Sequence, residues 1–367
     1  MTQQAVVETR GDRGGVLKNV QVLRAIAAYL VVFYHARVLT PIESVMPVDF
    51  GNAGVDIFFV ISGFIIAHVS RQGDFGRPGA FMAKRVVRIA PIYWLITLFL
   101  FAMALVTPGL AGAAGPPTGA MLIKSLLFIP YFDGSGAVHP VLFVGWTLNN
   151  EMFFYLVFAA ALLIRREVLR LAVVSAALLA LVGLGLVSPP RGAPMQTYTD
   201  PLMIEFVAGM WLSLVYRLRS PAGPLSAGRR ISLLLLGATM FGVLVLGDSA
   251  WPHLHRVVKW GLPAIAIMAV ALWLEQPSAS ASAGWRIPLL LGEASYSIYL
   301  THPFVIKAAD LVRGRLPDLG PALDATLLVL VLISVGVAGV MTHLLLEKPI
   351  LAALRPVLKP RVARGST

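Results

Sequence analysis

Cysteine is absent from this 367-residue chain, and charged side chains are scarce. Without cysteine there is no disulfide, no thiolate metal site and no cysteine nucleophile. Charged residues make up 13% of the chain, whereas a soluble globular domain is about a quarter charged. This composition excludes an ordinary soluble enzyme, a disordered chain and a coiled coil.

Long apolar runs take the place of the missing charges. Hydrophobic residues make up 57% of the chain, and the mean hydropathy is +0.80. A helix needs about 20 mostly apolar residues to cross a bilayer. Ten stretches meet this requirement, so we predict an all-α polytopic membrane protein with about ten transmembrane helices, at residues 20–40, 53–70, 88–107, 142–164, 168–187, 201–217, 231–247, 257–274, 287–308 and 324–346. A further apolar patch, 121–131, contains Lys124 and is too short to span, so we predict an interfacial or re-entrant piece there.

The basic residues set the predicted orientation. The formal net charge is +12, from 30 Lys and Arg residues against 18 Asp and Glu residues. With ten spans and a cytoplasmic amino terminus, most of the basic residues fall on the cytoplasmic side, as the positive-inside rule requires. We therefore predict that both termini are cytoplasmic. The sequence shows no pattern of a nucleic-acid-binding surface, so we predict no nucleic-acid partner.

The first span holds an arginine and a histidine on one face. In LRAIAAYLVVFYHA, Arg24 and His35 are eleven residues apart, which is about three helical turns, or about 16 Å along the axis. His35 therefore lies deep in the membrane, where a neutral imidazole can act as a general base. The alternative is a histidine bonded to a neighbouring helix, with Arg24 as a topology or headgroup residue.

Charged residues also enter the second and third spans. Asp56, in GVDIFFVISGF, either pairs with His35 or lies in the first turn of its helix, where the helix dipole favours an acid. Lys84, Arg85 and Arg88, in KRVVRIAP, cluster at the cytoplasmic mouth of the third span. Such a cluster suits the phosphates of a nucleotide, and plain topology is the alternative.

Two later spans contain carboxylates. Asn149, Asn150 and Glu151 lie in GWTLNNEMFFY, with Tyr155 one turn further on, and Glu205 lies in DPLMIEFVAGMW. A carboxylate at membrane depth is either functional or a hydrogen-bonded tie between helices.

The segment LGEASYSIYLTHPF is unusually polar for a span. Ser295, Tyr299 and His302 fall at i, i+4 and i+7, on one face of one helix, and Tyr296 lies elsewhere around it. So many polar side chains imply a wet interior. The face is not a hydrolase triad, because no G-x-S-x-G motif or orienting acid accompanies it. The sequence also has no H-E-x-x-H or Walker A motif, and we predict no metal.

Taken in order, these motifs resemble those of the acyltransferase 3 family of integral membrane enzymes. LRAIAAYLVVFYH is similar to the family's Arg-x10-His element, KRVVRIAP to its Arg-x-x-Arg element, and WTLNNEMFFY to the motif of members that acylate exopolysaccharide or O-antigen. GVDIFFVISGF, SYSIYLTHP and LLLEKPI are similar to other helices of the family, and the resemblance covers roughly residues 18–350. Asn150 stands where the family usually has tyrosine, a difference that bears on acceptor preference.

The resemblance implies an acyltransferase 3 transmembrane domain at 20–348, between cytoplasmic tails at 1–19 and 349–367, in the bacterial inner (plasma) membrane. It also implies transfer of an acyl group, usually acetyl, from cytoplasmic acyl-CoA to a hydroxyl of a surface or extracytoplasmic glycan such as exopolysaccharide or O-antigen. The expected partners are acyl-CoA, a glycan or lipid-linked sugar acceptor, and membrane lipid.

The resemblance also implies roles for residues of this chain. His35 would be the catalytic histidine, Arg24 would support it or the donor, and Arg85 and Arg88 would hold the donor phosphates. Our predicted site adds Asp56 and Glu151 to the catalytic set and Lys84 to the donor set. It assigns a larger group to substrate binding, namely Asn149, Asn150, Tyr155, Glu205, Ser295, Tyr296, Tyr299 and His302.

Two other functions are compatible with the residues. A transporter or flippase for a lipid-linked sugar would use the buried His, Asp and Glu residues as a proton relay, although the sequence shows no internal repeat. A structural or sensory membrane protein would need fewer buried polar residues. For the acyltransferase, direct transfer with His35 as general base and an acyl-histidine intermediate are both compatible with the sequence.

Overall fold

The computed structural model describes residues 17–39, 49–70, 74–107, 115–219, 225–275, 283–315 and 320–358. All regular structure within these ranges is helical, as predicted. Most of the predicted tail 1–19 and residues 359–367 of the predicted tail 349–367 lie outside them.

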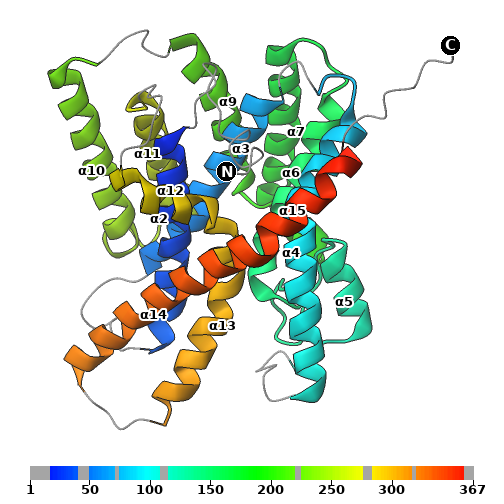
Figure 1. The fold of residues 1–367 in the computed structure, drawn as a ribbon. Coiled ribbons are helices and arrows are strands. Elements are labelled where there is room, and N and C mark those ends of the chain that lie inside the picture. Colours follow the sequence, from blue (N-terminus) through cyan, green and yellow to red (C-terminus); the bar gives the residue numbers. More distant parts are fainter. Residues whose placement is uncertain are drawn as a thin grey trace, which may run out of the picture.

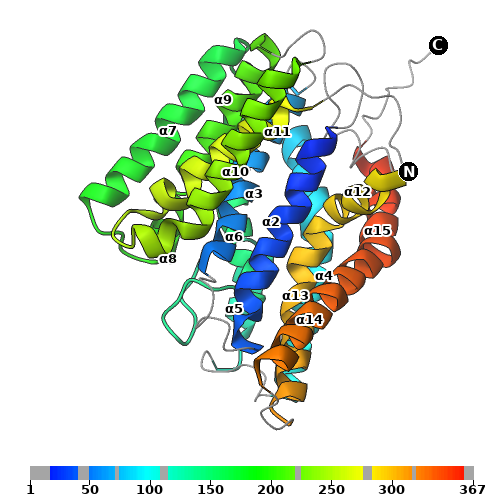
Figure 2. The ribbon, with the colours of Figure 1, turned by 90° about the vertical axis from the view of Figure 1, so that its left-hand side faces the viewer.

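Helices α2 and α3 form the centre of the bundle (Figures 1 and 2). In the most apolar window of α3, 83% of residues are buried, against 11% in α10, which therefore stands at the periphery. One part of the hydrophobic core joins α3 to α4, α6, α7 and α9, and two others join α2 to α11 and to α13 and α14. The first half of the chain contributes α2 (Lys18–Ala36), α3 (Ala53–Val69), α4 (Pro78–Val106), α5 (Gly119–Leu126), α6 (Trp146–Ala161) and α7 (Glu167–Val187).

The second half of the chain completes the bundle with α8 (Ala193–Tyr198), α9 (Met203–Arg219), α10 (Ala227–Ala250), α11 (Leu262–Trp273), α12 (Arg286–Glu293), α13 (Ser295–Arg313), α14 (Pro321–Thr342) and α15 (Lys348–Leu354). A π-turn, His343–Glu347, joins α14 to α15, and a second, Val257–Gly261, precedes α11. In Figure 1 the joined α14 and α15 run obliquely across the bundle, in orange to red, and cross in front of α13 and α4.

Several helix starts follow from local sequence. Thr118 caps α5, where its hydroxyl accepts a hydrogen bond from the Met121 backbone N–H at 3.3 Å. Ser226 caps α10 in the same way. Pro78 begins α4, because proline suits the first turn of a helix, where its missing N–H costs nothing.

Among the residues that the structure describes, seven helices are long and apolar enough to cross a membrane. The other predicted spans also contain helices. However, α6 has only 16 residues, Val257–Trp273 is a shorter apolar helix, and the predicted span 287–308 is divided at Ala294 between α12 and α13. The structure thus supports a multi-pass membrane protein, while the number ten and the cytoplasmic placement of both termini stay predictions. The patch 121–131 contains the eight-residue helix α5, far too short to span.

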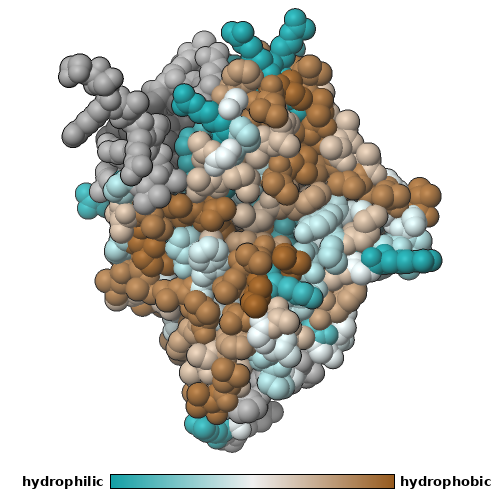
Figure 3. All heavy atoms as spheres, turned by 90° about the vertical axis from the view of Figure 1, so that its right-hand side faces the viewer, coloured by the Kyte–Doolittle hydropathy of each residue, from teal (hydrophilic) through white to brown (hydrophobic). Residues whose placement is uncertain are grey.

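The outer surface matches this assignment. Figure 3 shows hydrophobic residues, in brown, over much of one face of the molecule. Large apolar side chains of α4 and α7 are exposed, among them Leu98, Phe99, Leu105, Leu169 and Leu184. So much exposed apolar surface suits a lipid environment.

A close helix crossing joins α3 and α9 through two glycines. A Cβ atom at Gly63 would lie 2.2 Å from the Phe206 carbonyl oxygen, and one at Gly209 would lie 2.1 Å from the Val60 carbonyl oxygen. Small residues of this kind let helix backbones approach in membranes. Next to the crossing, the Phe206 ring stacks between Phe59 at 4.5 Å and Phe154 at 4.4 Å.

We predict that Gly63→Val destabilises the protein strongly, because the new side chain meets backbone that cannot move aside. Overpacking a core typically costs about 1–3 kcal/mol, and a backbone clash places this variant at the upper end. Gly242→Val is the matched control, since a Cβ at Gly242 meets no atom within 4 Å. Fluorescence-detected size-exclusion after heating should show a large fall in apparent Tm for Gly63→Val alone. An equal fall in both variants would contradict the close crossing.

Candidate active site

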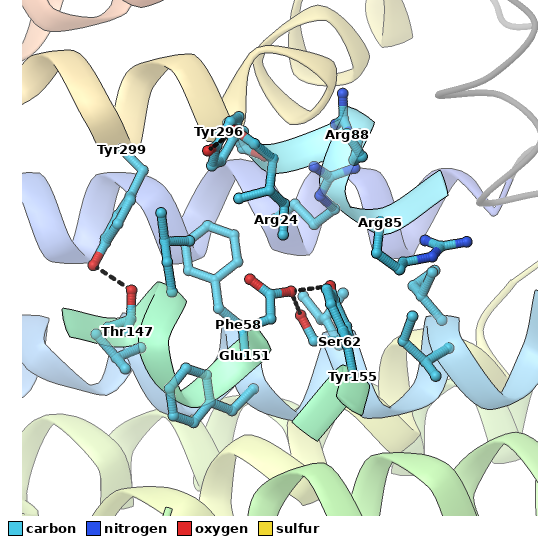
Figure 4. Close-up of a pocket in the computed structure, with 18 residues that line it drawn as sticks. Arg24, Phe58, Ser62, Arg85, Arg88, Thr147, Glu151, Tyr155, Tyr296 and Tyr299 are labelled. Atoms are coloured by element: carbon cyan, nitrogen blue, oxygen red, sulfur yellow. Dashed lines mark hydrogen bonds between the residues drawn. The ribbon is translucent and has the colours of Figure 1, made fainter. Parts of the chain in front are cut away.

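A cavity of about 120 Å³ lies among α2, α3, α4, α6 and α13. We call it the inner cavity, because it lies toward the amino-terminal end of α2. In Figure 4, arginine side chains stand at one end of it and Thr147 and Tyr299 at the other, with Glu151 between them. The structure brings eight of the predicted site residues together in its lining, namely Arg24, Arg85, Arg88, Glu151, Tyr155, Ser295, Tyr296 and Tyr299.

Glu151 is the central acid of the inner cavity. Its carboxylate accepts hydrogen bonds from the Ser62 hydroxyl at 2.7 Å and from the Tyr155 hydroxyl one turn further along α6. Arg24 and Arg85 attract it electrostatically. Glu151 and Tyr155 therefore share one face of α6, and Ser62 joins them from α3.

The three arginines of the inner cavity differ in their contacts. Arg24 donates to the Gln21 side chain at 3.3 Å, and Arg85 lies over the Phe81 ring at 5.5 Å. Arg88 forms an ion pair with Glu347 at 2.6 Å. Arg88 is thus held to the π-turn between α14 and α15.

Glu347 is a buried acid that our sequence reasoning did not single out. Besides Arg88, it accepts a hydrogen bond from Ser297 at 2.6 Å, and it contacts the His343 Nδ1 atom at 2.8 Å. The π-turn places His343 and Glu347 side by side, both buried. The available signal was the charge in LLLEKPI at the end of an apolar run, since such charges usually have a partner inside the protein.

A second cavity, of about 580 Å³, is lined by His35. We call it the outer cavity, and its walls come from α2, α4, α5, the segment 131–143 and α13. Most of its lining is apolar, including Phe99 and Phe304, whose ring centroids are 6.0 Å apart. Polar groups at its rim include Asp133, His139, Lys307 and Asp310.

His35 pairs with His302 of α13. The His35 Nδ1 atom lies 2.9 Å from the Val31 carbonyl oxygen and 3.3 Å from the His302 Nε2 atom. The His302 Nδ1 atom lies 2.7 Å from the Tyr299 carbonyl oxygen. Because carbonyl oxygens only accept, both Nδ1 atoms are assigned the protons. This tautomer leaves the His35 Nε2 atom with a free lone pair, as a general base requires.

Tyr299 lines one end of the inner cavity (Figure 4). Its hydroxyl donates to the Val144 carbonyl oxygen at 2.8 Å and lies 2.9 Å from the Thr147 hydroxyl. Tyr299 lines the inner cavity, and His302, one turn further along α13, contacts His35 of the outer cavity. The two cavities are therefore adjacent along one face of α13. Thr147 was not among the predicted residues.

The rim of the outer cavity holds a compact polar turn. Asp133 accepts hydrogen bonds from the Ser135 hydroxyl at 2.6 Å and the Ala137 backbone N–H at 3.0 Å, and it contacts His139 at 3.2 Å. Burial raises the pKa of a carboxyl group, yet the hydrogen bonds from Ser135 and Ala137 hold the pKa of Asp133 below its ordinary value. Asp133 is therefore a fixed anion at the mouth of this cavity.

The structure does not bring Asp56 to His35. Asp56 instead pairs with Arg256, with distances of 2.6 Å to Nη2 and 3.2 Å to Nε, and the buried Glu205 lies beside it. The suggested Asp56–His35 pair is therefore not the contact observed. Arg256, from the segment before α11, also donates to the Asn52 carbonyl oxygen at 3.0 Å, which holds its guanidinium group at the start of α3.

Three further predicted site residues lie apart from the cavity linings. Lys84 pairs with Asp74 at 2.6 Å. Asn149 and Asn150 are buried in the first turn of α6, outside the lining of both cavities. Sequence order placed them beside Glu151, but successive residues of a helix point in different directions.

We predict that Asp56→Asn lowers stability, because it removes the buried carboxylate that pairs with Arg256. Breaking a buried pair typically costs about 3–5 kcal/mol. The double variant Asp56→Asn, Arg256→Met should recover part of the loss. Asp49→Asn is the matched control: its pair with Arg37 is partly exposed and should be worth at most about 1 kcal/mol. Apparent Tm values test this, and a wild-type Tm for Asp56→Asn would contradict a structural role.

Comparisons with known proteins point to one family. The model of a family described as an acyltransferase domain matches residues 17–344. The exopolysaccharide production protein ExoZ of Rhizobium meliloti (strain 1021) is 39% identical over 304 residues, which cover 82% of this chain and 90% of that protein.

More distant relatives have related descriptions. The putative membrane-bound transacylase BcsY of Komagataeibacter xylinus is 27% identical, covering 90% of this chain and 82% of that protein. The peptidoglycan O-acetyltransferase OatA of Listeria monocytogenes is 26% identical, covering 82% of this chain and 51% of that protein. No solved structure matches. The family match over almost the whole chain shows that this protein belongs to the acyltransferase 3 family.

Proposed function

We propose that this protein is a membrane O-acyltransferase that moves an acyl group, acetyl in the simplest case, from cytoplasmic acyl-CoA to a hydroxyl of a surface or extracytoplasmic glycan. The observation that carries the proposal is the pair of adjacent cavities. Arginines line one of them, and the other is lined by His35, whose Nε2 atom is assigned a free lone pair. The similarity to an exopolysaccharide production protein supports a polysaccharide acceptor.

The donor enters from the inner side in this proposal. Arg24 and Arg85 offer cationic groups to the phosphates of CoA, because guanidinium groups bind phosphate in a bidentate manner. Arg88, which pairs with Glu347, helps to shape that end of the cavity. The pantetheine arm then runs past Glu151 toward the outer cavity, and the Thr147 and Tyr299 side chains must turn aside to admit the thioester.

The acceptor enters the outer cavity. The His35 Nε2 atom takes the hydroxyl proton, and the hydroxyl oxygen bonds to the thioester carbonyl carbon. The carbon–sulfur bond breaks, and the proton passes from the imidazolium to the CoA thiolate. Asp133 and His139 at the rim offer hydrogen-bonding groups to sugar hydroxyls. Holding the thioester and the acceptor hydroxyl together beside His35 provides the proximity that acyl transfer needs.

We predict that His35→Ala loses at least about 10²-fold in acyl transfer without unfolding, since general-base assistance contributes about 10²–10⁴-fold. His253→Ala, in an exposed position, is the matched histidine control. Purified protein in nanodiscs would be incubated with radiolabelled acetyl-CoA and a cell-surface glycan fraction, and both CoA release and labelled glycan would be followed.

Retained transfer in a well-folded His35→Ala would refute the role of His35. CoA release in one stoichiometric burst without acceptor would favour the acyl-histidine route over direct transfer. No CoA turnover by the wild type with any glycan or acyl chain would favour the alternative, a transporter or flippase that moves a lipid-linked sugar unchanged in mass.

We also predict that His302 acts as a positioning residue through His35. A hydrogen bond to a group that becomes charged is worth about 1.5–3 kcal/mol, or about 10- to 100-fold in rate. His302→Leu should lower kcat by this factor, leave KM for acetyl-CoA unchanged and shift the pH profile of kcat. His302→Gln should restore part of the rate, because its amide oxygen can accept the His35 Nδ1 proton. Equal losses in both variants would indicate a packing role only.

A further inference from the structure

A third cavity, of about 630 Å³, is a groove between α2, α10 and α11. Neither the donor path nor the acceptor path proposed above uses it. Figures 1 and 2 show α10 at the edge of the bundle, beside α11 and α2. Only two residues of α10 are buried, Leu244 and Gly247, and both lie in its last third.

Each helix gives the groove one apolar face. The α2 face includes Val22 and Ile26, the α10 face includes Leu234 and Phe241, and the α11 face includes Ile267. Ile26, Leu234 and Phe241 are all more than 40% exposed, so the groove is open to the surroundings of the protein. At membrane depth those surroundings are lipid chains.

The length of the groove matches one leaflet. Arg230 and Phe241 line it at positions eleven residues apart on α10, which is about 16 Å along a helix. Half of a hydrocarbon core is about 15 Å thick. One acyl chain of a phospholipid would therefore fill the groove from the headgroup level to the bilayer centre.

The polar end of the groove carries excess positive charge. Lys18, Arg230 and Glu275 line it, and the Lys18 ammonium lies 5.9 Å from the Trp285 ring centroid. The Glu275 carboxylate accepts hydrogen bonds from the backbone N–H groups of Lys18 at 3.0 Å and Asn19 at 2.9 Å. The Glu275 carboxylate thus holds the start of α2. Two cations and one carboxylate line this end of the groove, which leaves an excess of one positive formal charge.

We propose that this groove binds one anionic phospholipid, with its headgroup phosphate at Lys18 and Arg230 and one acyl chain between α2, α10 and α11. The tryptophan fits this placement, because indole rings prefer the membrane interface. The groove shares no lining residue with either cavity of the proposed acyl transfer, so the lipid proposal does not depend on that function.

The test measures lipid retention by the full chain. Native mass spectrometry and thermal shift in detergent would compare added phosphatidylglycerol, phosphatidylcholine and inorganic phosphate. A surface cation contributes about fivefold to the binding of anionic lipid. Arg230→Gln should therefore weaken phosphatidylglycerol binding about fivefold, and Lys18→Gln, Arg230→Gln about 25-fold. Arg229→Gln is the matched control, an exposed neighbour that does not line the groove.

A second variant tests the apolar part. Ala238 lines the groove, so Ala238→Trp should fill it and abolish retention of both lipids while the protein stays folded. Equal retention of the two lipids by the wild type, or an equal effect of Arg229→Gln and Arg230→Gln, would overturn the proposal. Stabilisation by inorganic phosphate alone would indicate a free-anion site instead. A dimer that is lost in Ala238→Trp would identify a second copy as the occupant.

Discussion

The cost of a charge at membrane depth organises this protein. An ionised side chain among apolar helices needs a partner inside the protein, and each such partnership ties two distant segments together. Asp56 of α3 holds Arg256 before α11, and Arg88 of α4 holds Glu347 of the π-turn after α14. Glu151, inside the inner cavity, is instead held by neutral hydroxyls and by two nearby arginines. The first two pairs tie helices together, whereas Glu151 lines the inner cavity.

Helix α2 connects the two halves of the proposed reaction. Arg24 near its start lines the inner cavity and His35 near its end lines the outer one. Helix α13 runs alongside and supplies Tyr299, which lines the inner cavity, and His302, the partner of the proposed base. In the proposed reaction the two substrates arrive from opposite sides, so the reacting groups would meet within the bilayer.

Different parts of the site were predictable to different degrees. The eight residues of the inner cavity were found because polar side chains in apolar runs are rare and have few explanations. Lys84, Asn149 and Asn150 were chosen with them because of neighbouring positions in the sequence, yet their side chains lie outside both cavities. Glu347, His343, Asp133 and His139 were missed, since their importance comes from contacts made across the fold or within an irregular turn.

The sequence by itself determined that this is an all-helical membrane protein, because composition and apolar run length depend on local residues alone. Its ordered motifs resembled those of the acyltransferase 3 family. It also determined that Arg24 and His35 share a helix face, since helix periodicity is a local property. Only the tertiary structure decided the partner of each buried charge. Sequence spacing alone would allow Asp56 to pair with His35. In the folded protein, Asp56 pairs instead with Arg256, 200 positions away. Pairings of this kind depend on which helices pack together, and that is the outcome of all contacts in the bundle at once.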